Sequence, residues 1–389
     1  MKAYPRAFWL LCVACLFFFS SFTMVIPDMP LVLEKLGGRE YIWLIIPSFA
    51  IIALIMRPLS GKMTDTNGRV FVMIIGAVIT TLSGLFYLFV PLVSLLFAVR
   101  AFHGISAGFT PTGFTAYADD IVPLHKRGEA MGIIGICNNI GNAMGWVIGS
   151  QFTKSFGLDA MFLFSSLLGF ISIVLFSFLK ESIKDKKKIN IQLLKFNRHD
   201  LIEKRVLLPS FIFLLTCFSS GAILALIGDF STYLNIDNKG LFMAVYIGAS
   251  LFIRFMAGRW SDRYGRQKIA MIGCFLLFLS MLSLAFAQDI MFYLVSSVLF
   301  GVAFGLLSPS IFAWAVDISL PGLKGKAVGT LFIFMELGII LGSAIGGILY
   351  NNNSENFAKI FNLCGVLSLV PLLIILINKR KQKRRLQVA

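Results

Sequence analysis

The sequence predicts an all-α integral membrane protein with about twelve transmembrane helices arranged in two pseudo-symmetric six-helix bundles. Of its 389 residues, 58% are hydrophobic and 14% are charged, whereas soluble domains have roughly 45–50% and about 25%. A soluble core cannot hold this much apolar material, because too little polar surface would remain to cover it. Apolar runs of about 20 residues, enough to cross a bilayer as helix, recur almost from end to end.

The apolar runs are too long and too uniform for the alternating strands of a membrane barrel, so we expect helices throughout. The first run begins near Phe8 and lacks a small-residue cleavage site, which favours a retained helix over a signal peptide. We place the spans at residues 7–27, 41–60, 70–90, 92–116, 128–151, 159–179, 207–229, 240–258, 268–287, 290–315, 325–349 and 357–377.

The Lys and Arg residues predict the orientation. The formal net charge is +16, but the basic residues cluster in short segments between apolar runs, as in cytoplasmic loops, and do not indicate nucleic-acid binding. We therefore expect a multi-pass protein of the cell inner (plasma) membrane with both termini cytoplasmic. Of the 35 Lys and Arg, the predicted outer segments hold only Lys35, Arg39, Lys154, Lys239 and Lys359.

The pattern divides the chain into four parts. We expect an N-terminal bundle over 1–179, a cytoplasmic basic linker over 180–206, a C-terminal bundle over 207–378 and a basic cytoplasmic tail over 379–389. The tail is suited to anionic headgroups, so membrane lipids are expected partners. All six cysteines fall in apolar spans, which implies packing rather than a disulfide framework.

The two halves share a repeated pattern of glycines and charges. A shift of 197 residues places the first half on the second, and Arg57, Gly61, Asp65, Gly68 and Arg69 fall on Arg254, Gly258, Asp262, Gly265 and Arg266. Two six-span halves are typical of transporters, in which they rock around a central site. The same shift places Asp120 on Asp317, and Gly141, Gly145 and Gly149 on Gly338, Gly342 and Gly346.

The segments 61–69 and 258–266 resemble the loop 2–3 and loop 8–9 signature of the major facilitator superfamily, and residues 100–104 (RAFHG) resemble the fourth-helix motif of its drug:proton antiporter branch. The resemblance implies the twelve-helix major facilitator fold, a gating role for the loop motif and a proton-coupling role for Arg100. The antiporter pattern of the fifth helix has proline where this chain has Trp146, and the equivalent position in the second half is Ser343. This departure weakens the inference of drug:proton antiport and leaves the inference of the fold unchanged.

The repeated glycines predict close packing and turns. Gly61 and Gly258 should allow close helix approach, and Gly68 and Gly265 should permit a tight turn before the next span. The glycines at four-residue intervals in the fifth and eleventh spans should form packing seams.

Asp65 is expected to accept from backbone N–H groups at a nearby helix start and to pair with Arg57, Arg69 or Lys62. The motif is then either a conformational latch or a static topology anchor, and a second carboxylate at Asp262 favours the latch. The acids at the cytoplasmic helix ends are expected to pair with nearby Lys or Arg; they are Asp119, Asp120 and Asp317.

Charged residues within spans are expensive and are therefore functional candidates. Arg100 lies mid-span and corresponds to Ser297 in the second half, so it does not belong to the shared scaffold. His103 lies roughly 60° further around the same helix and is either a buried neutral hydrogen-bonding group or a proton carrier.

Glu336 is the first candidate for a protonatable or cation-contacting group. It and its counterpart Asn139 lie about 160° from the glycine seams, toward an expected central cavity. Asn138 and Asn142 are candidate cavity-wall or inter-helix hydrogen-bonding groups. Asp28 is either a solvated helix-end carboxylate or a coupling group.

These features predict a monomeric secondary transporter that moves a small molecule by alternating access, with proton-coupled efflux of a drug or metabolite as the leading hypothesis. A proton-linked importer or facilitator of a nutrient is the alternative, and a membrane-embedded sensor or enzyme is a remote one. No Walker sequence, H-E-x-x-H or nucleophile elbow occurs, so we expect no enzymatic activity, no cofactor and no metal.

Overall fold

The computed structural model describes residues 4–123, 127–183, 202–319 and 324–388, and within these ranges it does not describe the side chains of residues 127–129, 255, 324–326 and 378–388. Most of the predicted linker over 180–206, and the side chains of the predicted basic tail, therefore lie outside the described residues. All regular elements in the described part of the chain are helices.

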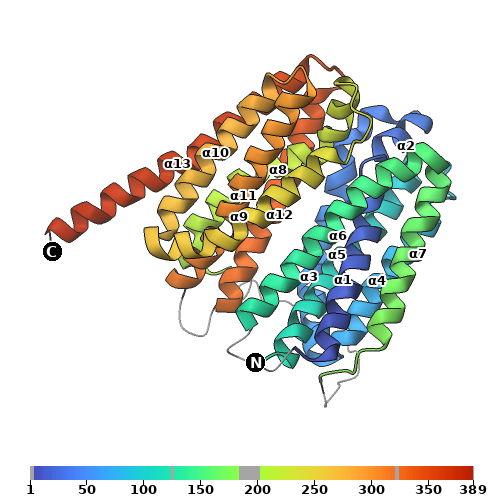
Figure 1. The fold of residues 1–389 in the computed structure, drawn as a ribbon, viewed down its shortest axis with the longest axis horizontal. Coiled ribbons are helices and arrows are strands. Elements are labelled where there is room, and N and C mark those ends of the chain that lie inside the picture. The colour runs from blue at the N-terminus through green and yellow to red at the C-terminus, as the bar shows by residue number, and fades with distance from the viewer. Residues whose placement is uncertain (1–3, 124–126, 184–201, 320–323, 389) are drawn as a thin grey trace. The chain divides into compact units, whose positions relative to one another are not determined.

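The chain separates into two compact units: unit 1 comprises Met1–Phe196 and Asn238–Ala244, and unit 2 comprises Asn197–Asp237 and Val245–Ala389. In Figure 1 the helices α1 to α7 of unit 1 are blue to green, and the later helices α8 to α13 are yellow-green to red. The helices of unit 1 are α1 (Arg6–Met24), α2 (Met29–Lys35), η1 (Arg39–Leu44), α3 (Ile45–Thr66), α4 (Arg69–Tyr87), α5 (Val93–Ile121), α6 (Arg127–Phe156) and α7 (Leu158–Ser177). The remaining helices are η5 (Lys204–Val206), α8 (Leu207–Tyr233), α9 (Leu241–Tyr264), α10 (Arg266–Ala285), α11 (Ile290–Ile318), α12 (Lys324–Tyr350) and α13 (Asn356–Val388).

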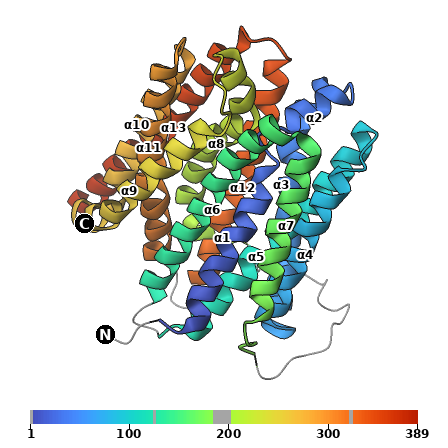
Figure 2. The ribbon, with the colours of Figure 1, turned by 45° about the vertical axis from the view of Figure 1, so that its right-hand side comes forward.

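Helix pairing in unit 1 recurs in unit 2. In unit 1, α1 packs against α6 and α7, and α4 packs against α5 and α7 (Figure 2). In unit 2, α8 packs against α12 and α13, and α10 packs against α11 and α13. Because α1, α4, α5, α6 and α7 correspond in chain order to α8, α10, α11, α12 and α13, the repeat seen in the sequence is also a repeat in packing.

Eleven helices in the described residues are long and apolar enough to span a membrane, and a bent pair, Leu241–Arg254 with Met256–Tyr264, provides a twelfth span if counted as one. Large apolar side chains on these helices remain exposed, among them Phe170, Phe252 and Val366. Such a surface would be unfavourable in water and is the surface expected against lipid. The predicted all-α membrane fold is confirmed.

The C-terminal end of the first span differs from the prediction of a single helix over 7–27. Helix α1 ends at Met24, and a separate short helix, α2, begins at Met29 with Pro30 in its first turn. Proline favours a helix start, because its missing N–H would be unpaired there in any case. The break places Asp28 at the junction of the two helices.

Candidate functional site

Arg69 joins the ends of three helices in unit 1. Its Nη1 donates to Oδ1 of Asp65 across 2.6 Å, and its Nε donates to Oδ2 of Asp120 across 3.1 Å. The Nη1 group also donates to the Thr64 carbonyl at 2.6 Å. Because a guanidinium presents several N–H groups in a fixed fork, one side chain can hold the end of α3 and the end of α5 together.

Arg266 makes the same arrangement in unit 2. Its Nη1 pairs with Asp262 at the end of α9, and its Nε donates to Oδ2 of Asp317 at the end of α11 across 3.0 Å. Each of these residues is the counterpart of one in unit 1 under the 197-residue shift. We call the two groups the ionic triads: Arg69, Asp65 and Asp120 in unit 1, and Arg266, Asp262 and Asp317 in unit 2.

The glycines that precede the triad arginines make the predicted tight turns. Gly68 has φ of +137° and Gly265 has φ of +93°, and each is the residue directly before a helix start. L side chains rarely adopt this region, so glycine is the favoured residue. A Cβ at Gly68 would also collide with the carboxylate of Glu181.

The prediction that Asp65 accepts from a helix-start N–H is wrong for this structure. Glu181 fills that role, since its Oε1 accepts from the backbone N–H of Arg69 across 2.8 Å, while Asp65 is engaged with the Arg69 side chain. Arg57 and Arg254 lie about two helical turns before the triad aspartates, on α3 and α9, and neither is a member of an ionic triad.

Within its own unit, no described helix approaches Gly61 or Gly258 closely. A Cβ built at either position would meet no described atom within 4 Å. Because there is room for a side chain at both positions, packing within its own unit does not require glycine at either one.

The glycine seams are confirmed. A Cβ at Gly141 would lie 2.6 Å from the Leu16 carbonyl oxygen, and one at Gly145 would lie 2.6 Å from that of Ser20. Helix α6 therefore approaches α1 backbone to backbone, as small residues permit in membranes. Gly149 continues this seam against Met24, and Gly338, Gly342 and Gly346 form the equivalent seam of α12 against Leu214, Phe218 and Ala222 on α8.

Arg100 is buried inside unit 1, with 1% of its surface exposed. Its Nε and Nη2 both donate to the carbonyl oxygen of Ile45 at 3.2 Å, and its guanidinium lies over the Phe49 ring, 4.9 Å from the centroid. The Nη1 group has no hydrogen-bond partner among the described residues. A carbonyl and an aromatic face thus hold the cation in place of a carboxylate.

His103 is buried one turn further along α5, on the same side of the helix as Arg100. Its ring lies 5.6 Å from both Phe22 and Phe49, and its Nδ1 lies 3.3 Å from the hydroxyl of Tyr87. Phe49 therefore contacts both Arg100 and His103. We call Arg100, His103, Phe22, Phe49 and Tyr87, which lie on α1, α3, α4 and α5, the Arg100 cluster.

Two polar nitrogens of the Arg100 cluster lack partners in the described part of the protein. They are Nη1 of Arg100 and Nε2 of His103. Most buried polar atoms in native structures are hydrogen-bonded, and exceptions need a physical explanation. Nη1 of Arg100 is a donor, whereas Nε2 of His103 is a donor or an acceptor according to the ring tautomer that its contact with Tyr87 selects.

In unit 2, Ser297 occupies the position equivalent to Arg100 and is fully buried on α11. Glu336 is buried on α12 with 6% of its surface exposed, and its counterpart on α6 is the partly buried Asn139. The charges buried by the two units are thus not duplicated, unlike the ionic triads.

The structure shows no inter-helix hydrogen bond from the Asn138 or Asn142 side chain in the described residues, and their cavity-wall role stays a prediction. The Oδ1 atom of Asn138 is buried and accepts no hydrogen bond from the described residues. The inter-helix bond at Asn142 is made by its backbone carbonyl, which accepts from the Thr23 hydroxyl at 3.2 Å.

Asp28 is not the solvated helix-end carboxylate that one interpretation of the sequence favoured. It is 3% exposed, and its Oδ1 lies 3.5 Å from Nζ of Lys239, which belongs to the Asn238–Ala244 segment of unit 1. Its Oδ2 has no hydrogen-bond partner in the described residues. The Asp28 carboxylate is therefore buried with one long ion pair as its charge partner.

The two units with their ionic triads and glycine seams match a known family. The sequence model of the Major Facilitator Superfamily matches residues 10–237 and 209–388. The chain belongs to the Major Facilitator Superfamily. It is therefore a multi-pass membrane transporter and not an enzyme, which confirms the family resemblance and the expected class of protein.

Similar proteins of this superfamily include named efflux pumps. The chain is 26% identical over 366 residues to the multi-drug resistance efflux pump PmrA homolog of Lactococcus lactis, covering 88% of this chain and 89% of that protein. It is 25% identical over 374 residues to the quinolone resistance protein NorA of Staphylococcus aureus (strain COL), covering 94% of this chain and 95% of that protein.

Solved structures share the fold. A point mutant of the nucleoside transporter NupG superposes with a TM-score of 0.77 at 16% identity, covering 96% of this chain and 99% of that chain. A D-xylose-proton symporter gives a TM-score of 0.77 at 17% identity, covering 96% of this chain and 97% of that chain.

Sequence reasoning missed several residues of these sites. Glu181 lies in the predicted linker, and its position as the first acid after the sixth span is the only signal that marks it. Phe22, Phe49 and Tyr87 look like ordinary apolar residues of three different spans, and only the packing of α1, α3 and α4 on α5 brings them to His103.

Proposed function

We propose that this transporter exports a lipophilic small molecule, with cations as the first class to test, in exchange for protons by alternating access. Similarity to proteins named as multidrug efflux pumps supports the direction and the substrate class. The observation that carries proton coupling is the burial of Arg100 with an unbonded Nη1 in the described residues, one turn from the unbonded Nε2 of His103. A buried fixed positive charge disfavours any second positive charge in its surroundings, so a proton and a cationic substrate would compete there.

Each ionisable group has a place in the proposal. Arg100 supplies a fixed positive charge that disfavours a second cation or a protonated His103 nearby. Glu336 and Asp28 are the candidate carriers of the exchanged proton, since both are buried carboxylates. Glu336 also supplies the negative charge that would attract a cationic substrate in unit 2.

The ionic triads are proposed to act as the conformational latch. Each triad ties together the ends of helices that the repeat places at equivalent positions, and Asp65 and Asp262 keep 74% and 66% of their side-chain surface exposed. Exposed ion pairs are individually weak and can be broken and remade at little cost. We also propose that both termini and both triads lie on the cytoplasmic side and that the chain works as a monomer.

The direction of transport is tested in cells that lack other efflux pumps, with ethidium as the probe and fluorescence as the readout of dye held in the cell. Cells expressing the protein should hold less ethidium than cells expressing Arg100→Gln at the same membrane level. Greater accumulation in the expressing cells would show import, and equal accumulation would exclude this substrate class.

A further inference from the structure

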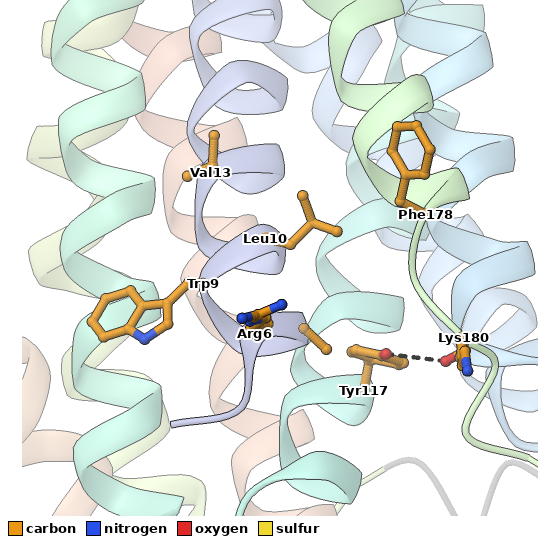
Figure 3. Close-up of a pocket in the computed structure, with 8 residues that line it drawn as sticks. Arg6, Trp9, Leu10, Val13, Tyr117, Phe178 and Lys180 are labelled. Atoms are coloured by element: carbon orange, nitrogen blue, oxygen red, sulfur yellow. Dashed lines mark hydrogen bonds between the residues drawn. The ribbon is translucent and has the colours of Figure 1, made fainter. Parts of the chain in front are cut away.

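A pocket of about 600 Å³ lies in unit 1, where the candidate span α1 begins and the candidate span α7 ends. Figure 3 shows Arg6 and Lys180 on the two sides of Tyr117, with Leu10, Val13 and Phe178 beyond them along α1 and α7. The pocket includes no member of the Arg100 cluster and no member of an ionic triad. Nothing in the proposed transport cycle uses it.

The floor of the pocket is rigid. Tyr117 is buried, and its hydroxyl donates to the carbonyl oxygen of Lys180 across 3.0 Å. This bond fixes the chain where it leaves α7 against α5. The Lys180 side chain is therefore anchored by its backbone at the rim of the pocket.

The two cations at the rim are not neutralised by the described part of the protein. No acidic group there forms an ion pair with Arg6 or Lys180, and the neighbouring Glu181 is directed to the start of α4 by its bond to Arg69. Two unpaired cations that line one pocket favour an anion between them. The rim is therefore complementary to a negatively charged group.

The walls next to the rim are apolar and exposed. Phe178 has 72% of its surface exposed and Trp9 has 50%, and Val13 continues the exposed face of α1. Arg6, Leu10 and Val13 follow one another at helical spacing, so the polarity along this face passes from cationic to aliphatic. Cations and amphipathic aromatics at a span end mark the headgroup level of a bilayer, and the aliphatic side chains mark its interior.

We infer that this pocket binds an anionic phospholipid, with its headgroup between Arg6 and Lys180 and an acyl chain against Leu10, Val13 and Phe178. A free anion would match the cations but leave the apolar wall uncovered. A zwitterionic lipid would cover the wall but leave the net charge of the rim uncompensated. Only an amphiphile with an anionic head matches both parts in their order along the helices.

The inference is tested by native mass spectrometry of the delipidated full-length protein, titrated separately with phosphatidylglycerol and phosphatidylcholine. The protein should bind phosphatidylglycerol more tightly than phosphatidylcholine. Arg6→Gln/Lys180→Gln should lose about 25-fold in phosphatidylglycerol affinity, or about 5-fold for each charge. The control Lys35→Gln/Lys154→Gln removes the same charge at the opposite helix ends of unit 1 and should bind like the unmodified protein.

A second variant separates the pocket from general surface attraction. Ala7→Leu fills part of the pocket and keeps both cations, so it should also weaken phosphatidylglycerol binding. Equal affinities for the two lipids, or unchanged binding by the double variant or by Ala7→Leu, would overturn the inference. Competition by inorganic phosphate at concentrations near those of the lipid would overturn it too, because the site would then recognise a free anion.

Discussion

Arg69 donates from Nε to Oδ2 of Asp120 across 3.1 Å, and Arg266 repeats that bond to Asp317 across 3.0 Å in the second unit. In each unit the same arginine also pairs with an aspartate four residues earlier in the chain. Agreement at the level of individual atoms shows that the duplication preserved an ionic device as well as a helical scaffold.

Breaking a triad should impair transport far more than folding. We expect Arg69→Ala and Arg266→Ala each to lower the free energy of unfolding by only about 1 kcal/mol, because the aspartates are partly or largely exposed. Transport should fall by roughly 5-fold or more, the size of a typical conformational coupling. Thermal unfolding in detergent and initial rates in proteoliposomes measure the two effects.

The matched control for the triads is Arg39→Ala. Arg39 forms an exposed ion pair with Glu34 at 2.9 Å in unit 1, outside the triads. Its substitution should change neither stability nor rate. A triad variant that behaves like Arg39→Ala would reduce the triads to topology anchors.

We expect the positive charge of Arg100 to be required for proton coupling. Arg100→Gln keeps a donor for the Ile45 carbonyl but loses the charge and the contact with Phe49. Because the guanidinium has no carboxylate partner in the described residues, its loss leaves no unpaired acid, and stability should change by no more than about 1–3 kcal/mol. Substrate flux should then no longer respond to a pH gradient, whereas Arg100→Lys should keep part of the response.

The glycines of the seams and of the loop motif should respond to substitution in opposite ways. Gly342→Ala forces a Cβ against the backbone of Phe218 and should cost about 1–3 kcal/mol of stability. Gly61→Ala meets open space inside a helix and should raise stability by up to about 1 kcal/mol. Melting curves of the two variants measure both changes in stability. A loss of stability in Gly61→Ala equal to that in Gly342→Ala would contradict the open space found beside Gly61 on α3.

The proton carrier should be identified by a paired substitution. Asp28→Asn and Glu336→Gln each replace a buried carboxylate by a neutral group of similar shape. The variant that removes the carrier should transport at a rate independent of pH, and the other should keep the pH dependence of the unmodified protein. Initial rates at several external pH values measure this. Unchanged pH dependence in both variants would exclude both residues.

The scaffold was predictable because its signals are periodic and repeated. Span lengths follow from the thickness of the bilayer, and the constant 197-residue shift exposes the duplication. The bond between Arg69 and Asp65 could be expected, because Asp65 and Arg69 lie four residues apart across a turn. The turns at Gly68 and Gly265 follow from the freedom of glycine at positive φ.

The remaining features depend on which helices meet, and a single sequence does not contain that information. Glu181 displaces Asp65 at the start of α4 because the chain leaving α7 returns beside that end. Tyr87 reaches His103 only because α4 packs along α5. Asp28 is buried beside Lys239, and a single sequence does not reveal that these two residues, 211 positions apart, lie together.

The most direct test of proton-coupled export is proton movement in everted membrane vesicles whose interior has been acidified by respiration. Addition of ethidium should release protons through the unmodified protein, measured by the recovery of a pH-sensitive dye, and should not do so through Arg100→Gln. Ethidium uptake at the same rate with and without the pH gradient, and with no release of protons, would contradict the account.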